Sequence, residues 1–183
     1  MILKTIESQK LDVKSLGEKF KYQKELTKKL DAEKRDFDQA IINEIVLWKV
    51  NRYAGLKNET LQLINEIRVD ALTRDDELTR KVLELLLAEG GIRLPMASTI
   101  LRFRNPKIYQ IIDQRVYRFI CGEALPTLFS IPKQITLYFE YLEKLKEVCE
   151  NHKIPFGEAD RILYQADKEL NGDIALSGYG SKG

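Results

Sequence analysis

Histidine, cysteine and tryptophan are scarce in this sequence. Its 183 residues include one tryptophan, one histidine (His152) and two cysteines, Cys121 and Cys149. A histidine-dependent catalytic triad would have to be built around His152, which lies near an expected helix end, where a solvated histidine suits the helix dipole. Two widely spaced cysteines form neither a disulfide framework nor a Cys-rich zinc or iron–sulfur site. We therefore expect no metal or other cofactor, and a reducing, cytoplasmic setting.

Long apolar runs are also missing. The best candidate, residues 82–88, is interrupted by Glu84, whereas a membrane-spanning helix needs about 20 predominantly apolar residues. Met1 is followed by no long hydrophobic region and no small-residue cleavage site, so we expect no secretion signal. The sequence accordingly predicts a protein without a membrane partner.

A strong excess of one charge is absent as well. The 30 lysines and arginines nearly balance the 28 aspartates and glutamates, for a formal charge of +2, and 44% of the residues are hydrophobic. This composition excludes wholesale disorder and permits a buried core. The length fits one compact domain, which could form two lobes around a cleft. We assign residues 1–176 to one helical domain and expect a flexible tail at residues 177–183.

The nearly neutral total conceals a basic belt between Gly90 and Ile120. This stretch has six basic residues against a single acid, Asp113. A localised basic region indicates a site for a polyanion, and the planar guanidinium fork suits phosphate oxygens. Charge alone fits equally well with arginines that are dispersed over the surface and paired with neighbours. The six basic residues are Arg93, Arg102, Arg104, Lys107, Arg115 and Arg118.

Helical periodicity dominates the chain, and no strand-like alternation competes with it. We expect an all-α fold of roughly eight helices, at residues 15–30, 37–53, 58–71, 73–89, 95–104, 114–121, 132–151 and 157–171. Asn58 is expected to cap the third helix, and Thr73 with Asp76 approximates a capping box for the fourth. Pro95 suits the first turn of the fifth helix. The side chains that this helix is expected to turn inward are Met96, Ala97, Ile100 and Phe103.

The most informative pattern lies between Gly90 and Val116. Gly90-Gly91 separates two expected helices, and residues 111–116 read Ile-Ile-Asp-Gln-Arg-Val. A tight glycine-containing turn between helices points backbone N–H groups outward at the start of the second helix. Together with the helix dipole, these amides form a phosphate seat that does not depend on base sequence.

Over residues 73–121 the arrangement resembles the helix-hairpin-helix superfamily of base-excision DNA glycosylases. The pattern of that superfamily reads like Leu-Pro-Gly-Val-Gly-x-Lys-x-Ala-Ser, then a helix, then Val-Asp-x-His/Arg-Val. In this sequence Gly91 falls on the first hairpin glycine and Asp113 on the aspartate. The other matching positions are Ile92, Ala97, Ser98, Arg115 and Val116.

Two positions depart from the superfamily pattern. The second hairpin glycine is Arg93 here, a residue that adopts a positive φ angle less readily. The lysine that bifunctional members use as a Schiff-base nucleophile is Pro95, which has no amine. Monofunctional relatives also lack this lysine and keep the aspartate. The resemblance therefore implies a divergent, monofunctional glycosylase without lyase activity, which binds double-stranded DNA and would be associated with the nucleoid in a bacterium. We expect a monomer.

Asp113 is the expected catalytic residue. Cleavage of an N-glycosidic bond builds oxocarbenium-like charge on the sugar, and a nearby carboxylate stabilises that charge and orients or deprotonates water. Asp113 also fits a helix N-cap, and the two roles are compatible. The expected phosphate-binding residues are Gly90, Gly91, Ile92, Arg93, Leu94, Arg102, Arg104 and Lys107. The aromatic candidates for a pocket that holds a flipped base are Trp48, Tyr53, Tyr109 and Tyr117.

Two other functions remain open. The departures at Arg93 and Pro95 fit a non-catalytic helix-hairpin-helix module that binds DNA and has lost the activity. A helical protein-interaction domain, whose long helix at residues 132–151 meets a partner, is the third hypothesis. Release of a free base separates the first hypothesis from the second, and salt-dependent duplex binding separates both from the third.

Overall fold

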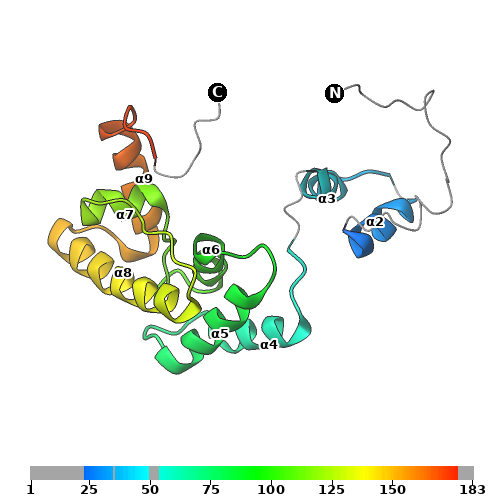
Figure 1. Cartoon of the computed structure of the whole chain (residues 1–183), viewed down its shortest axis with the longest axis horizontal. Helices are drawn as coiled ribbons and strands as arrows, with labels where there is room; N and C mark the ends of the chain where they lie inside the picture. Colours follow the sequence, from blue (N-terminus) through cyan, green and yellow to red (C-terminus); the bar gives the residue numbers. More distant parts are fainter. Residues whose placement is uncertain (1–22, 35, 50–53, 177–183) are drawn as a thin grey trace, which may run out of the picture. The chain divides into compact units, whose positions relative to one another are not determined.

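The computed structural model describes residues 23–34, 36–49 and 54–176. These residues form eight α-helices, one 3-10 helix and no strand, which confirms the all-α prediction (Figure 1). The helices are α2 (Lys24–Asp31), α3 (Gln39–Lys49), α4 (Asn58–Glu66), α5 (Asp76–Ala88), α6 (Leu94–Arg104), α7 (Gln114–Cys121), α8 (Ile131–His152), η2 (Phe156–Glu158) and α9 (Ala159–Leu170). The expected helical segments 15–22 and 50–53, with Tyr53, and the expected tail at 177–183 lie outside the described residues.

Contacts along the chain divide it into two units, residues 1–53 and 54–183. The domain assigned to residues 1–176 therefore extends over both. In the first unit, α2 and α3 bury Leu26 and Ile41. The indole N–H of Trp48 donates to the Thr27 hydroxyl at 2.9 Å, so this aromatic candidate is engaged within the first unit.

The second unit holds the larger hydrophobic core, in which α7 packs against α8 and α9 (Figure 1). Ile112 and Val116, on either side of Asp113, have no exposed surface. Burial of one such aliphatic side chain is worth about 1.5–3 kcal/mol. The core thus fixes the backbone on both sides of Asp113. The other fully buried hydrophobic side chains are Val82, Leu83, Leu86, Ala97, Leu101, Ile135, Tyr138, Leu142, Leu145 and Ala159.

Helix α4 differs from its prediction at both ends. Asn58 is the first helical residue and Lys57 occupies the cap position, without a side-chain hydrogen bond. The helix ends at Glu66, whereas the apolar spacing predicts a helix up to Ala71. The backbone turns away after Glu66 because Ile67 adopts an extended conformation.

Helix α5 is capped by a residue that the sequence pattern overlooks. The Asp75 carboxylate accepts a hydrogen bond from the backbone N–H of Leu78 at 2.9 Å. The predicted capping box of Thr73 and Asp76 is therefore wrong. Asp75 stands directly before the first helical residue, where an acidic cap reaches the free amides of the first turn.

Helix α6 turns a different face inward from the one predicted. Ala97 is buried, but Met96 and Phe103 are 48% and 67% exposed. The buried face includes two polar residues, Ser98 and Arg102. The spacing of apolar residues predicts the wrong face because Ser98 and Arg102 are buried with polar partners inside the second unit.

The predicted boundaries around the hairpin and α7 are confirmed. Pro95 lies in the first turn of α6, and this helix ends directly before Asn105. Helix α7 runs from Gln114 to Cys121 with Asp113 at its N-cap. Cap and breaker residues act on their immediate neighbours, so these boundaries follow from local sequence.

Candidate functional site

The stretch that leads into α7 has no regular secondary structure and is held by three helices. The hydroxyls of Tyr138 and Tyr141, both in α8, donate to the carbonyl oxygens of Gln110 at 3.0 Å and Ile111 at 2.7 Å. The side-chain oxygen of Gln110 accepts from the backbone N–H of Asp160 in α9 at 3.3 Å. Helix α6 supplies the third attachment through Ser98.

Ser98 ties this stretch to the start of α6. Its buried hydroxyl donates to the carbonyl oxygen of Pro95 at 2.8 Å and accepts from the backbone N–H of Ile112 at 3.2 Å. One side chain therefore links the first turn of α6 to the residue that precedes Asp113. The hairpin and Asp113 are positioned relative to each other by this link.

Asp113 caps α7 with one of its two carboxylate oxygens. Oδ1 accepts hydrogen bonds from the backbone N–H groups of Arg115 at 2.7 Å and Val116 at 2.9 Å. Within the described residues, Oδ2 accepts no hydrogen bond. The predicted N-cap is confirmed, and one oxygen remains for another task.

A cavity of about 490 Å³ lies beside Asp113. Its volume falls within the range of small-molecule sites, roughly 300–1,000 Å³. One part of its wall is the hairpin and the first turn of α6, and another part is the start of α7. Two segments that are distant in the sequence thus border one space. The lining residues are Arg93, Leu94, Pro95, Asp113, Gln114, Arg115, Leu125, Pro126, Thr127, Leu128, Gln134, Leu137, Tyr164 and Leu176.

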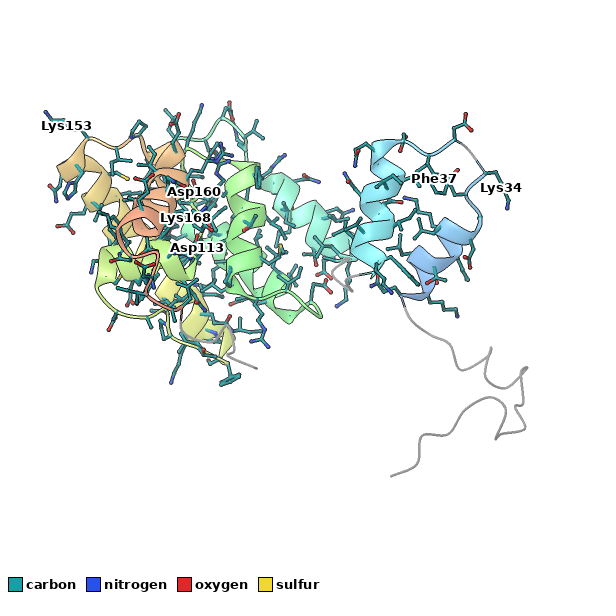
Figure 2. All side chains as sticks on the ribbon, turned by 90° about the horizontal axis from the view of Figure 1, so that it is seen from above. Lys34, Phe37, Asp113, Lys153, Asp160 and Lys168 are labelled. Carbon is teal, nitrogen blue, oxygen red and sulfur yellow. The ribbon has the colours of Figure 1, made fainter. Side chains whose placement is uncertain are left out.

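The surroundings of Asp113 raise the pKa of its carboxyl group. Burial is the largest cause, and the negative charges of Asp160 and Asp167 act in the same direction. Figure 2 marks Asp113 and Asp160 in this part of the second unit. The hydrogen bonds from Val116 and Arg115 oppose the shift without cancelling it. A carboxyl group with a raised pKa beside a cavity is a candidate for proton transfer.

The hairpin between α5 and α6 has the expected glycine conformation at one of its two glycines. Gly91 has a φ of +85°, which glycine adopts without steric cost. Arg93 has φ −114° and ψ 169°, which is ordinary extended backbone. The missing second hairpin glycine therefore causes no backbone strain. Ile92 is buried and its N–H donates to the carbonyl oxygen of Glu89 at 3.3 Å, so it anchors the hairpin.

Most backbone N–H groups of the hairpin have no partner among the described residues. The start of α6 also has no side-chain cap. Unpaired amides at a helix N-terminus, together with the positive end of the helix dipole, favour an anion. The amides concerned are those of Gly90, Gly91, Arg93, Leu94 and Met96.

Arg102 lies in the interior and contacts α9. Its side chain pairs with Asp160, with 3.3 Å between Nε and Oδ2, and the angle is outside that of a hydrogen bond. Its Nη2 donates to the carbonyl oxygen of Gly157 at 3.1 Å. With 6% of its surface exposed, Arg102 is committed to the fold and has no free face for a phosphate.

The Arg104 side chain binds carbonyl groups at the C-terminal end of α4. Its Nε and Nη2 donate to the carbonyl oxygens of Ile67 and Asn65, each at 2.7 Å. These bonds occupy carbonyl groups that a helix C-terminus leaves unpaired. Of the predicted phosphate-binding side chains, Arg93 and Lys107 are the exposed cations.

Arg115 and Arg118 of α7 share one buried carboxylate, that of Asp167 in α9. Arg118 donates to both of its oxygens, at 2.7 and 2.8 Å, and also to the carbonyl oxygens of Asn171 and Ile174. Arg115 donates to Asp167 Oδ2 once, at 3.1 Å. Arg118 thus gives four of its five N–H donors to the fold, whereas Arg115 gives one to Asp167, lines the cavity and keeps donors for a ligand.

The aromatic residue of the cavity wall is one that the sequence-based list omits. Tyr109 and Tyr117 are buried, and the Tyr109 hydroxyl lies 2.6 Å from that of Thr79. Tyr164 of α9 lines the cavity, with the Arg115 guanidinium 5.6 Å from its ring centre. No local signal distinguishes Tyr164, because the wall forms only when α9 packs against α7.

Among the described residues, no group of three or more His, Cys, Asp or Glu side chains could hold a metal ion. None of the helices in the described ranges is long and apolar enough to cross a membrane. Comparisons of this chain with family models, curated proteins and solved structures give no match.

Proposed function

We propose that this protein is a monofunctional DNA glycosylase of the helix-hairpin-helix type, which hydrolyses the N-glycosidic bond of a damaged or mismatched base. One observation carries the proposal: residues 93–95 of the hairpin and the Asp113 carboxylate line the same cavity of about 490 Å³. The superfamily resemblance requires this juxtaposition, because the hairpin holds the DNA backbone while the carboxylate faces the sugar of the flipped nucleotide.

Asp113 performs the chemical step through its uncommitted oxygen. The bond from the base nitrogen to the sugar carbon breaks, the base leaves with the electron pair and takes up a proton, and water adds to the carbon. Asp113 Oδ2 stabilises the positive charge on the sugar and accepts the proton from water. Because burial raises its pKa, Asp113 is a stronger base than an exposed aspartate.

The hairpin and two arginines hold the DNA backbone in this proposal. The free amides of Gly91 and Leu94 and the positive end of α6 seat a phosphate. Exposed Arg93 adds charge at the same wall, and Arg115 presents the donors that Asp167 leaves free. Arg102 and Arg104 have no part in this surface, since the fold uses both.

Pro95 determines the outcome of the reaction. It lines the cavity at the position where the superfamily resemblance places the hairpin lysine. Proline has no amine, so water attacks the sugar, the strand stays intact at the abasic site, and borohydride traps no adduct. Pro95→Lys brings an amine to this wall and should permit some Schiff-base trapping, with a poor yield because its pKa is not lowered by neighbours.

Base release from a panel of damaged and mismatched duplexes tests the proposal. Asp113→Asn keeps an N-cap of equal quality while removing the carboxylate. We expect it to lower base release by about 100-fold or more and to leave duplex affinity unchanged. Asp75→Asn is the matched control, because Asp75 also caps a helix but does not line the cavity. Equal rates for the two variants would assign Asp113 to capping alone.

A non-catalytic DNA-binding module is the second candidate. The observation that favours it is the complete N-cap at Asp113, which explains this residue without any chemistry. This candidate predicts salt-dependent duplex binding with no release of any base, and no change in binding on Asp113→Asn.

A further inference from the structure

The two helices of the first unit present outer surfaces of different character. Every exposed residue of α2 is charged, as expected of a solvated helix. Helix α3, which packs against α2 (Figure 1), instead exposes aliphatic side chains. Ile42 and Val46 are 41% and 53% exposed, and their spacing of four residues places them on one face of α3. The exposed residues of α2 are Lys24, Glu25, Lys28, Lys29 and Asp31.

The core of the first unit is small within the described residues. In residues 23–34 and 36–49, the buried hydrophobic side chains are Leu26 and Ile41. Burial of one such side chain is worth about 1.5–3 kcal/mol, whereas ordering the backbone of each residue costs about 1–2 kcal/mol. Small folded units often rely on disulfides, metals or oligomerisation. The first unit has no cysteine and no histidine, so association through an exposed apolar face is the favoured source of further stability.

The charges at the two ends of α3 indicate what covers this face. Asp38, directly before α3, and Lys49, its last residue, lie in line with Ile42 and Val46, because the spacings of four, four and three residues follow helical turns. Both charged side chains are exposed, and neither forms an ion pair within the described residues. The face therefore has a negative end, an apolar middle and a positive end. A second α3 that runs antiparallel presents the complementary order.

We propose that the α3 face, defined as Asp38, Ile42, Val46 and Lys49, is a homodimer interface in which two copies of α3 pack antiparallel about a two-fold axis. In this arrangement Ile42 contacts Val46 of the second copy. Asp38 approaches Lys49 of the second copy, and symmetry repeats both contacts. The Asp38 carboxylate keeps its local role as well, since Oδ1 accepts from the backbone N–H of Ile41 at 2.8 Å. The inference concerns the first unit and is independent of the proposed activity. A dimer differs from the monomer expected from the sequence.

Sedimentation equilibrium of the full-length protein over a range of about 1–200 μM tests the dimer, because the population of a dimer depends on protein concentration. Helix α3 has 11 residues, which is about three turns. The interface is therefore small, and we expect a dissociation constant of about 10 μM.

Two neighbouring substitutions in α3 test the apolar middle of the face. Val46→Asp places a charge opposite Ile42 of the second copy, so we expect the dissociation constant to rise by about 30-fold or more. Leu47→Asp is the matched control, because Leu47 is also an exposed aliphatic residue of α3, at 39%. It lies about 100° further round the helix than Val46. We expect Leu47→Asp to change the dissociation constant by less than about twofold.

Lys49→Glu tests the antiparallel register without altering an apolar contact. The new carboxylate would face Asp38 of the second copy at both ends of the dimer. We expect the dissociation constant to rise about tenfold at low salt and to recover as salt is added. Lys34→Glu is the control, because Lys34 is exposed in the segment before α3 (Figure 2) and lies outside the α3 face. This pair of variants keeps the test decisive where circular dichroism shows that Val46→Asp unfolds α3.

Loss of the dimer in Val46→Asp and its weakening in Lys49→Glu, with both controls intact, supports the interface. A wild type that stays monomeric at every concentration overturns it, as do equal effects of Val46→Asp and Leu47→Asp. A monomeric wild type that loses thermal stability in Val46→Asp alone overturns it too, and assigns the face to a contact within one chain. A dimer that Lys49→Glu leaves unchanged or strengthens refutes the antiparallel register, since parallel copies would place the two Lys49 side chains together.

Discussion

Helix α7 lies between two aspartates whose surroundings act on them in opposite ways. At its N-terminus, burial and the charges of Asp160 and Asp167 raise the pKa of Asp113. On the side facing α9, burial alone would raise the pKa of Asp167 too, but hydrogen bonds from Arg118, Asn171 and Arg115 outweigh it and lower the pKa. The Asp113 carboxylate borders the cavity and forms no ion pair among the described residues, whereas two guanidinium groups contact the Asp167 carboxylate.

The difference shows how charge in a sequence is divided between fold and surface. Arg115 and Arg118 are three residues apart and contact the same carboxylate, yet Arg118 also binds two carbonyl groups while Arg115 stays at the cavity. Arg102 is buried and Arg104 is half-buried, and both bind carbonyl groups within the fold. The number of basic residues in such a stretch of sequence is therefore an upper limit on the number of cations that a ligand can contact.

The largest stability loss is expected at the closed site. Asp167→Ala leaves two half-buried guanidinium groups without their carboxylate. We expect the free energy of unfolding to fall by about 3 kcal/mol, the lower end of the range for a buried pair. Chemical denaturation measures this change. Glu169→Ala on the same helix is the control, because Glu169 is exposed and should alter stability by less than about 0.5 kcal/mol. Equal effects would mean that the Asp167 cluster is not a structural element.

Removal of the Ser98 hydroxyl, which links the first turn of α6 to Ile112, should give the next largest loss of stability. Ser98→Ala leaves the buried N–H of Ile112 without a partner, which costs about 1–3 kcal/mol. Because this link also positions Asp113, base release should decline more than duplex affinity does. Thr99→Ala is the control, since the Thr99 hydroxyl also donates to the Pro95 carbonyl oxygen but touches nothing near Asp113. A pure stability effect without loss of activity would separate Ser98 from the site.

A pair of neighbouring glycines tests the hairpin itself. Gly91→Ala forces a side chain into a φ of +85° and should destabilise the protein by about 1 kcal/mol, although there is open space around the new methyl group. Gly90→Ala meets open space at an ordinary φ, so it should be neutral or slightly stabilising. Thermal unfolding and duplex binding of the two variants separate backbone strain from loss of the proposed phosphate seat. Similar effects of both changes would contradict the assigned role of Gly91.

Local signals made α7, its Asp113 cap and the hairpin turn predictable from the sequence. Each depends on a cap, a breaker or a glycine acting on adjacent residues. The roles of Arg102 and Arg104 were not predictable, because their partners lie in α9 and at the end of α4. The place of Tyr164 in the cavity wall was not predictable for the same reason, since this residue meets the start of α7 only through tertiary packing.

The smallest expected effect is the pH dependence that the two aspartates impose on stability. Folded Asp113 holds its proton more tightly than the unfolded chain does, so its contribution to stability declines as the pH rises from the ordinary value of 3.8 through its higher folded pKa. Asp167 behaves in the opposite way, and its contribution is lost as the pH falls below 3.8 through its lowered pKa. Urea unfolding at a series of pH values should show that Asp113→Asn removes the decline in stability above pH 3.8. Asp167→Asn should remove the decline below pH 3.8. Base release by the wild type should rise over the range in which Asp113 ionises, because only the carboxylate accepts a proton from water. If Asp113→Asn leaves the stability profile unchanged, the carboxyl group is not desolvated at the cavity, and the contrast between the two aspartates fails.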